Sequence, residues 1–207
     1  MRLTRHLATL AVAALVLLPA RAHAQVKLEV TPFFVSYYPL EFLRYVDGAN
    51  NERQEAGPGL GAALTYRFDN IWAVEAQAVY VSTGIIFRCT VSDCVNFSPP
   101  NNGRLILLNG RVLFQPRRTN IYFALGAGTI VRSGEAWEVT GIGNLSSVAG
   151  IVGFGVRARV SPTWGFKIGA ELHVYETDPD GPRPYYQKKM QKDVFVTIGV
   201  PINLIGK

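Results

Sequence analysis

Hydrophobic and polar residues alternate along most of the chain, and the longest alternating stretch runs from Val148 to Tyr175. Every second residue is apolar or glycine on each side of Ser161-Pro162-Thr163, a segment whose composition indicates a turn. A period of two over this length is typical of β-strands. Each half supplies more than the roughly 9 to 11 residues that a tilted strand needs to cross a bilayer. The pattern therefore predicts a long β-hairpin with one apolar side.

The same period recurs in six further segments, so that eight strands are predicted in all. In chain order they are residues 26–38, 60–68, 72–80, 105–114, 121–129, 148–160, 164–174 and 194–202. Their connections alternate between long and short, with long loops at residues 39–56, 83–103, 132–146 and 178–192. Only Glu41 to Tyr45 suggests a helical turn. Short turns on one rim and long loops on the other are typical of outer-membrane barrels.

The first 24 residues have the features of a secretory signal peptide. Arg2 and Arg5 precede an apolar run from Leu7 to Leu18, and Ala22-His23-Ala24 is a small-x-small cleavage site. We therefore divide the chain into a signal peptide, residues 1–24, and one barrel domain, residues 25–207. No later segment has the roughly 18 consecutive apolar residues of a transmembrane helix.

Charge and cysteine content exclude several classes of partner. The formal charge of +6 includes Arg2, Arg5 and Arg21, so the chain after residue 24 carries +3, and an exported protein of this charge is not expected to bind nucleic acid. Cys89 and Cys94 are the only cysteines, and export favours a disulfide between them over half of a metal site. We expect no metal and no cofactor.

Alternation alone does not decide whether the apolar face meets lipid or a protein core. A soluble barrel shows the same period with the apolar face inward. Aromatic side chains gather beside the short turns, where they would lie at the lipid headgroups: Phe68, Trp72, Phe114, Phe123 and Trp164. Together with export and the unequal loops, they favour an apolar face that meets lipid, in a closed barrel without unpaired edges.

With these features the chain resembles the small eight-stranded outer-membrane β-barrel family that includes the OmpA transmembrane domain, OmpX and OmpW. Its segment Thr197-Ile198-Gly199-Val200-Pro201-Ile202-Asn203-Leu204 resembles the family's C-terminal insertion signal, although Leu204 replaces the usual aromatic and residues 205–207 follow it. The resemblance implies an all-β, eight-stranded antiparallel up-and-down transmembrane β-barrel in the bacterial outer membrane. It also implies a monomer, with outer-membrane lipid, lipopolysaccharide and the barrel-assembly machinery as partners.

An outward apolar face places the polar face of each strand inside the barrel. The inward set includes Glu75, Arg111, Arg157, Arg159, Lys167, Glu171 and His173, together with Lys27, Glu29, Arg67, Gln77 and Asn109. Side chains just fill an eight-stranded barrel. We therefore expect a polar network that plugs the lumen, and the alternative is a narrow basic conduit.

Two further features suggest functions beyond a structural role. His173 is the only histidine after residue 24, so a lipid-modifying barrel enzyme would have to use it beside Glu171, but no serine lies in the same motif. The last long loop combines basic and aromatic residues suited to phosphate or sugar groups, or else it is merely solvated: Arg183, Tyr185, Tyr186, Lys188 and Lys189. We expect a structural, surface-binding or narrow-transport role, with such an enzyme or a soluble periplasmic ligand-binding barrel as alternatives.

Overall fold

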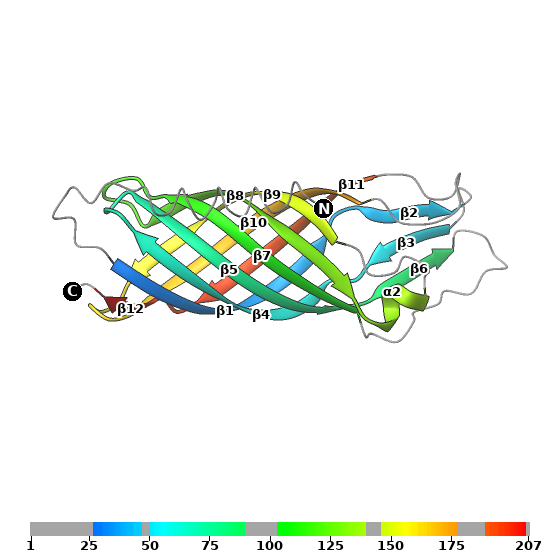
Figure 1. Cartoon of the computed structure of the whole chain (residues 1–207), viewed down its shortest axis with the longest axis horizontal. Helices are drawn as coiled ribbons and strands as arrows, with labels where there is room; N and C mark the ends of the chain where they lie inside the picture. The colour runs from blue at the N-terminus through cyan, green and yellow to red at the C-terminus, as the bar shows by residue number, and fades with distance from the viewer. Residues whose placement is uncertain (1–26, 47–49, 90–102, 140–145, 178–188, 206–207) are drawn as a thin grey trace, which may run out of the picture.

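The computed structural model describes residues 27–46, 50–89, 103–139, 146–177 and 189–205. Eight antiparallel strands form one sheet that closes into a barrel (Figure 1). The barrel strands are β1 (Lys27–Pro39), β4 (Gly57–Arg67), β5 (Trp72–Thr83), β7 (Gly103–Phe114), β8 (Ile121–Ser133), β9 (Ser146–Arg159), β10 (Gly165–Thr177) and β11 (Lys189–Gly199). The predicted strands and their up-and-down order are confirmed. The signal peptide lies outside the described residues and stays a prediction.

The barrel closes between β1 and β11, and prolines interrupt this seam. β11 pairs with β1 as far as Gly199 opposite Phe33, and β12 (Ile202–Ile205) resumes the pairing at Ile202 opposite Val30. Pro201 lies in the gap, where it has no N–H to donate. The backbone bond from Val200 N to Pro32 O, 3.1 Å long, bridges this gap. The last wall of the barrel is therefore one strand broken in two.

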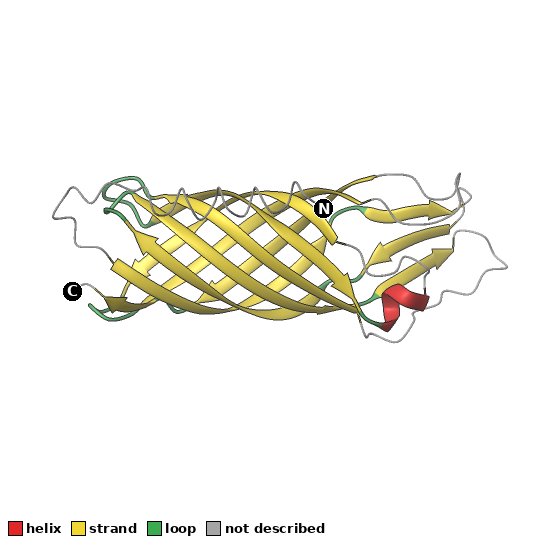
Figure 2. Cartoon of the chain, in the orientation of Figure 1, coloured by secondary structure: helices red, strands yellow, loops and turns green. Residues whose placement is uncertain are grey.

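A second, three-stranded sheet extends the barrel at the long-loop rim (Figure 2). It consists of β2 (Phe42–Val46), β3 (Asn50–Gln54) and β6 (Ile85–Cys89), which are paired in the order β2-β3-β6. The prediction of a helical turn at Glu41 to Tyr45 is wrong, because this segment pairs with β3 as a strand. The five-residue helix α2 (Glu135–Val139) follows β8 on the same rim. No helix in the described part of the chain is long and apolar enough to cross a membrane.

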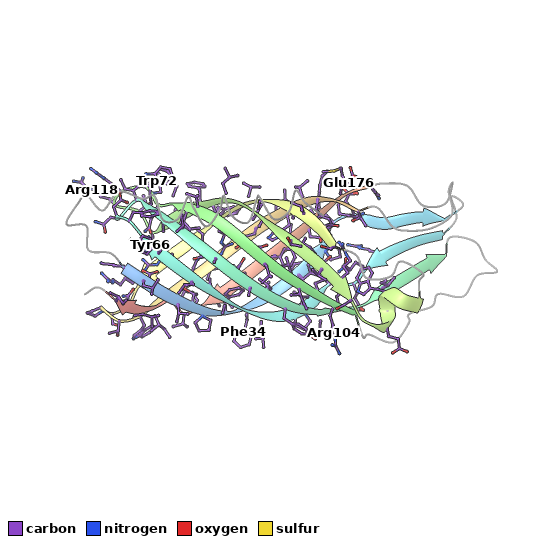
Figure 3. The ribbon with its side chains drawn as sticks, in the orientation of Figure 1. Phe34, Tyr66, Trp72, Arg104, Arg118 and Glu176 are labelled. Atoms are coloured by element: carbon purple, nitrogen blue, oxygen red, sulfur yellow. The ribbon has the colours of Figure 1, made fainter. Side chains whose placement is uncertain are left out.

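The alternating pattern of each barrel strand becomes an alternation of burial. On β7, Leu107 is fully buried whereas Leu108 is 62% exposed, and large apolar side chains cover the outside of every barrel wall. Figure 3 shows Phe34 and Trp72 projecting outward from the ribbon. An exterior this apolar is suited to hydrocarbon and not to water. The alternative of a soluble barrel with its apolar face inward is therefore wrong.

Close packing inside the barrel depends on glycines that face Tyr122. A Cβ on Gly155 would lie 2.6 Å from the Tyr122 ring and 2.2 Å from the carbonyl oxygen of Ile168. We expect Gly155→Ala to destabilise the barrel by about 1 to 3 kcal/mol, because the buried ring must move. Gly110→Ala is the matched control, since a Cβ there meets nothing within 4 Å. Urea unfolding followed by gel mobility checks this, and equal midpoints for the two variants would contradict the packing.

Candidate functional site

The barrel interior is the candidate site, because the predicted polar residues converge there. Nearest the short turns lies the rim layer, formed by Glu29, Arg67 and Arg157. The Glu29 carboxylate accepts hydrogen bonds from Arg67 Nε at 3.1 Å and from Arg157 Nη2 at 2.5 Å. Arg67 Nη1 also donates to Gln115 Oε1 at 3.4 Å. Strand β9 is thereby joined across the lumen to the paired strands β1 and β4.

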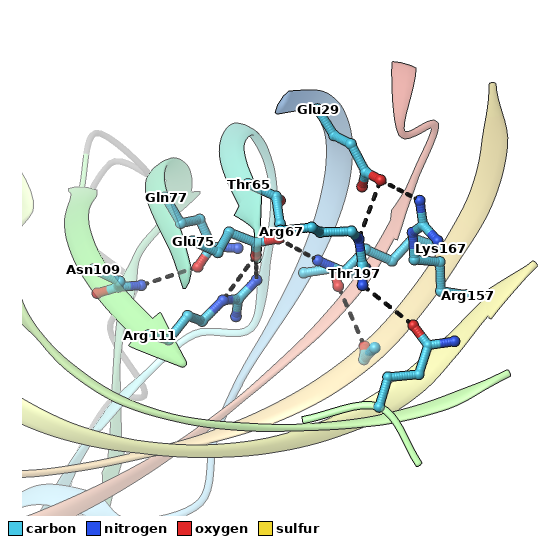
Figure 4. Close-up of polar contacts among 12 residues, drawn as sticks. Glu29, Thr65, Arg67, Glu75, Gln77, Asn109, Arg111, Arg157, Lys167 and Thr197 are labelled. Atoms are coloured by element: carbon cyan, nitrogen blue, oxygen red, sulfur yellow. Dashed lines mark hydrogen bonds and ion pairs between the residues drawn. The ribbon is translucent and has the colours of Figure 1, made fainter. Parts of the chain in front are cut away.

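A second group, the central layer, consists of Glu75, Arg111, Lys167, Glu171 and His173. Glu75 accepts hydrogen bonds from Lys167 Nζ at 2.7 Å and from Arg111 Nε at 2.9 Å (Figure 4). The Arg111 guanidinium also donates to Glu171, which lies on the opposite wall. All five side chains are buried. Buried charges are tolerated when they are paired in this way, because an unpaired one would lose its hydration without compensation.

Neutral polar residues complete the central region. Thr65 Oγ1 donates to Glu75 Oε2 at 2.5 Å, and Asn109 Nδ2 donates to Gln77 Oε1 at 3.1 Å. A void of about 10 Å³ lies beside Arg111 and Lys167. This is room for one water molecule at most. Side chains therefore fill the barrel at mid-height.

The outer half of the interior also contains an apolar cluster, which the prediction of a polar lumen did not include. Leu105, Leu107 and Ile130 are fully buried there, and they form one cluster with residues such as Phe33 and Phe195. The sequence reads Leu105-Ile106-Leu107-Leu108, so both faces of β7 are apolar at this height. A residue pattern that is apolar on both faces does not distinguish the lumen from the lipid side.

A third polar group, near the long loops, was not predicted. Arg132 donates to the Tyr175 hydroxyl, which donates in turn to the Asp193 carboxylate, and the Arg132 guanidinium lies 5.5 Å from the centroid of the Trp137 ring. All four residues are buried. The prediction began the last strand at Val194 and assigned Asp193 to the loop. Extending the alternation by one residue places Asp193 on the inward face, so the signal was present in the sequence.

The remaining predicted site residues are scattered. Arg159 lies exposed on the short-turn rim, outside both layers. Lys189 begins β11, and its Nζ is 3.9 Å from Glu41 Oε2. The described residues do not include Arg183, Tyr185, Tyr186, Lys188 and Cys94, and the Cys89 side chain also lies outside the description. The binding role of the loop and the disulfide therefore stay predictions.

His173 is enclosed by the central layer and by the apolar cluster. Its Nε2 lies 3.4 Å from Glu171 Oε2, and its ring centroid lies 4.4 Å from that of Phe195. Among the described residues, no hydroxyl group forms a hydrogen bond with His173, which a nucleophile activated by it would need. Nor do three His, Cys, Asp or Glu side chains gather as a metal site within the described ranges.

Comparisons with known proteins agree with this architecture. The model of a family described as "Outer membrane protein beta-barrel domain" matches residues 8–195. The crystal structure of the outer membrane protein OprG from Pseudomonas aeruginosa is similar, with a TM-score of 0.58 and 15% identity over 89% of this chain and 99% of that one. No curated protein sequence matches the chain.

Two further solved barrels share the fold at low sequence identity. Outer membrane protein AlkL, solved in lipid bilayers, has a TM-score of 0.56 and 13% identity over 91% of this chain and 94% of its own. Neisserial surface protein A has a TM-score of 0.51 and 11% identity over 88% of this chain and 99% of its own. At these identities the likeness concerns the fold alone.

Proposed function

Because the chain belongs to the outer membrane protein β-barrel family, we propose that it is a closed barrel of the bacterial outer membrane that acts through its external surface and not as a pore. The observation that carries this proposal is the central layer, in which Arg111 joins Glu75 to Glu171 across the lumen. The apolar cluster lies above this layer and adds a second closure. A narrow basic conduit is disfavoured, because the cations at mid-height, Arg111 and Lys167, are paired with carboxylates.

The external face carries the second sheet of the molecule. The sheet β2-β3-β6 continues beyond the barrel and gives the first two long loops a paired backbone scaffold (Figure 1). Binding residues concentrate on loops that a rigid scaffold positions. The barrel is thus a support for residues that reach the cell surface.

The proposed ligand of this face is glycolipid of the outer leaflet, lipopolysaccharide in particular. The last long loop carries Arg183, Tyr185, Tyr186, Lys188 and Lys189, which combine cations for phosphates with aromatic rings for sugars. Insertion by the barrel-assembly machinery would use the last strand, β11 with β12. The hydrogen-bond ladder of the barrel is closed, so the barrel walls offer no unpaired edge to a second copy, which supports a monomer.

A lipid-modifying activity gains no support from the interior. His173 is 1% exposed, and its partners in the barrel are a carboxylate and an aromatic ring. A hydrolase needs a nucleophile that the substrate can reach. The buried position is that of a packed polar residue.

Loss of the loop's basic and aromatic side chains tests the surface role. We expect a variant with Tyr185→Ser, Tyr186→Ser, Lys188→Gln and Lys189→Gln to retain lipopolysaccharide about tenfold more weakly, because ring and charge contacts are lost together. The measurement is lipopolysaccharide binding to refolded protein in nanodiscs. Arg104→Gln removes an exposed arginine outside this loop and is the control. Equal retention by both variants would contradict the proposal.

A further inference from the structure

A basic vestibule opens at the short-turn rim, between the short turns and the rim layer. It has a volume of about 530 Å³, and its cationic lining comprises Lys27, Arg67, Arg117, Arg118, Arg157 and Arg159. Two carboxylates, Glu29 and Asp69, belong to the same lining. In barrels of this class the short turns face the periplasm. The vestibule is thus a pocket of net positive charge, and the central layer closes the lumen beyond it.

The two carboxylates are already engaged by other groups. Glu29 is shared by Arg67 and Arg157. Asp69 Oδ1 accepts the backbone N–H groups of Ile71 at 2.6 Å and Trp72 at 2.7 Å, and so fixes the turn. Glu29 is therefore used in the rim layer and Asp69 in the turn, and neither forms an ion pair with the other cations of the lining.

Four cations of the vestibule have no carboxylate partner among the residues that the structure describes. They are Lys27, Arg117, Arg118 and Arg159. The charges of Arg159, Arg157 and Arg67 repel the Lys27 ammonium group, whereas the charge of Glu29 attracts it. Cations gathered in a concave site with low-dielectric walls produce a focused positive potential. Such a potential favours an anion that carries more than one charge.

Arg118 occupies a backbone conformation that arginine rarely adopts. Its φ is 65°, in the left-handed region that favours glycine or asparagine. Figure 3 shows Arg118 at the tip of the short-turn rim. An arginine at this position places a planar guanidinium group at the mouth of the vestibule. Its backbone conformation costs free energy. The unusual backbone conformation of Arg118 is an observation independent of the charge count.

From these features we infer that the vestibule binds a multiply charged phosphate-bearing anion. A phosphate group carries between about one and two negative charges at neutral pH and has several acceptor oxygens, which the guanidinium forks match in pairs. The space exceeds that of one phosphate, so a diphosphate or a phosphorylated lipid headgroup fits the same chemistry. Both sources are available to a periplasmic mouth at the membrane surface.

Titration of the refolded full chain tests this site. The probe is inorganic pyrophosphate, measured by calorimetry in phosphatidylcholine nanodiscs, with the pair Arg118→Gly and Arg159→Gln as the variant. We expect binding to weaken at least about tenfold, because two charge-assisted donors are lost. Arg118→Gly also relieves the backbone strain, so the folded fraction and the urea midpoint should not fall. The matched control is Arg104→Gln, which removes an exposed arginine at the opposite end of the barrel.

A second arm separates the two sources of phosphate. Nanodiscs that also contain phosphatidylglycerol are compared for lipid retained by the wild type and by the paired variant. Greater retention by the wild type, with competition by pyrophosphate, assigns the site to headgroups. Pyrophosphate binding that phosphatidylglycerol leaves unchanged assigns it to a free anion. If the wild type and the variant bind pyrophosphate and phosphatidylglycerol equally, the inference is overturned.

Discussion

Arg111→Met is expected to destabilise the barrel by roughly 3 to 5 kcal/mol, the largest effect of any single substitution considered. The substitution leaves Glu171 with no arginine partner and removes one of two cations from Glu75. Both carboxylates are buried, so water cannot replace the lost pairing. Urea unfolding of the refolded protein, followed by gel mobility without boiling, measures the loss.

Two comparisons make this prediction specific. Arg159→Met removes an exposed arginine without an ion-pair partner among the described residues, and should change the free energy of unfolding by less than about 0.5 kcal/mol. The double variant Arg111→Met with Glu171→Met should recover part of the loss, because Glu75 keeps Lys167 at 2.7 Å. A single variant as stable as the wild type would show that the central layer is not formed.

Leu107→Ala is expected to cost about 2 to 4 kcal/mol of unfolding free energy. Leu107 is fully buried in the apolar cluster, and truncation leaves a cavity that the surrounding walls cannot close. Its neighbour Leu108 is 62% exposed on the outside of the same strand. Leu108→Ala should cost less than about 1 kcal/mol, because lipid tails fill the space that the side chain leaves.

The adjacent pair serves as its own control, since the same substitution is made one residue apart. Unfolding in urea from lipid vesicles gives both values under identical conditions. Equal losses would mean that the outer half of the interior is not packed. A larger loss for Leu108→Ala would contradict the strand register of β7.

The barrel could be predicted from sequence because its signal is a simple period. Lipid outside and polar residues inside give β10 an apolar residue at every second position from Phe166 to Val174. The same rule placed Glu75, Arg111, Lys167 and Glu171 on one face. Which of these side chains meet depends on the register and stagger of strands that are far apart in the sequence. The alternating pattern specifies neither.

Other parts of the molecule lacked such a signal. β3 reads Asn50-Asn51-Glu52-Arg53-Gln54, with no apolar alternation, and it becomes a strand through its pairing with β2 and β6. Around Leu105 and Leu107 both faces are apolar, so the alternation disappears at the height where the lumen lining becomes apolar. The vestibule brings two turn residues, Arg117 and Arg118, to Arg157 and Arg159 on another strand. The pairing of β8 with β9 makes them neighbours, and closure of the barrel adds Lys27 and Arg67.

Planar-bilayer recording tests the central claim that the central layer and the apolar cluster close the lumen. Refolded protein, shown to be folded by its gel mobility, is inserted under an applied voltage, with a large open porin as the positive control. The plug of paired charges and the apolar cluster predict no steady conductance steps from the wild type. Reproducible single-channel steps from folded protein would contradict the account.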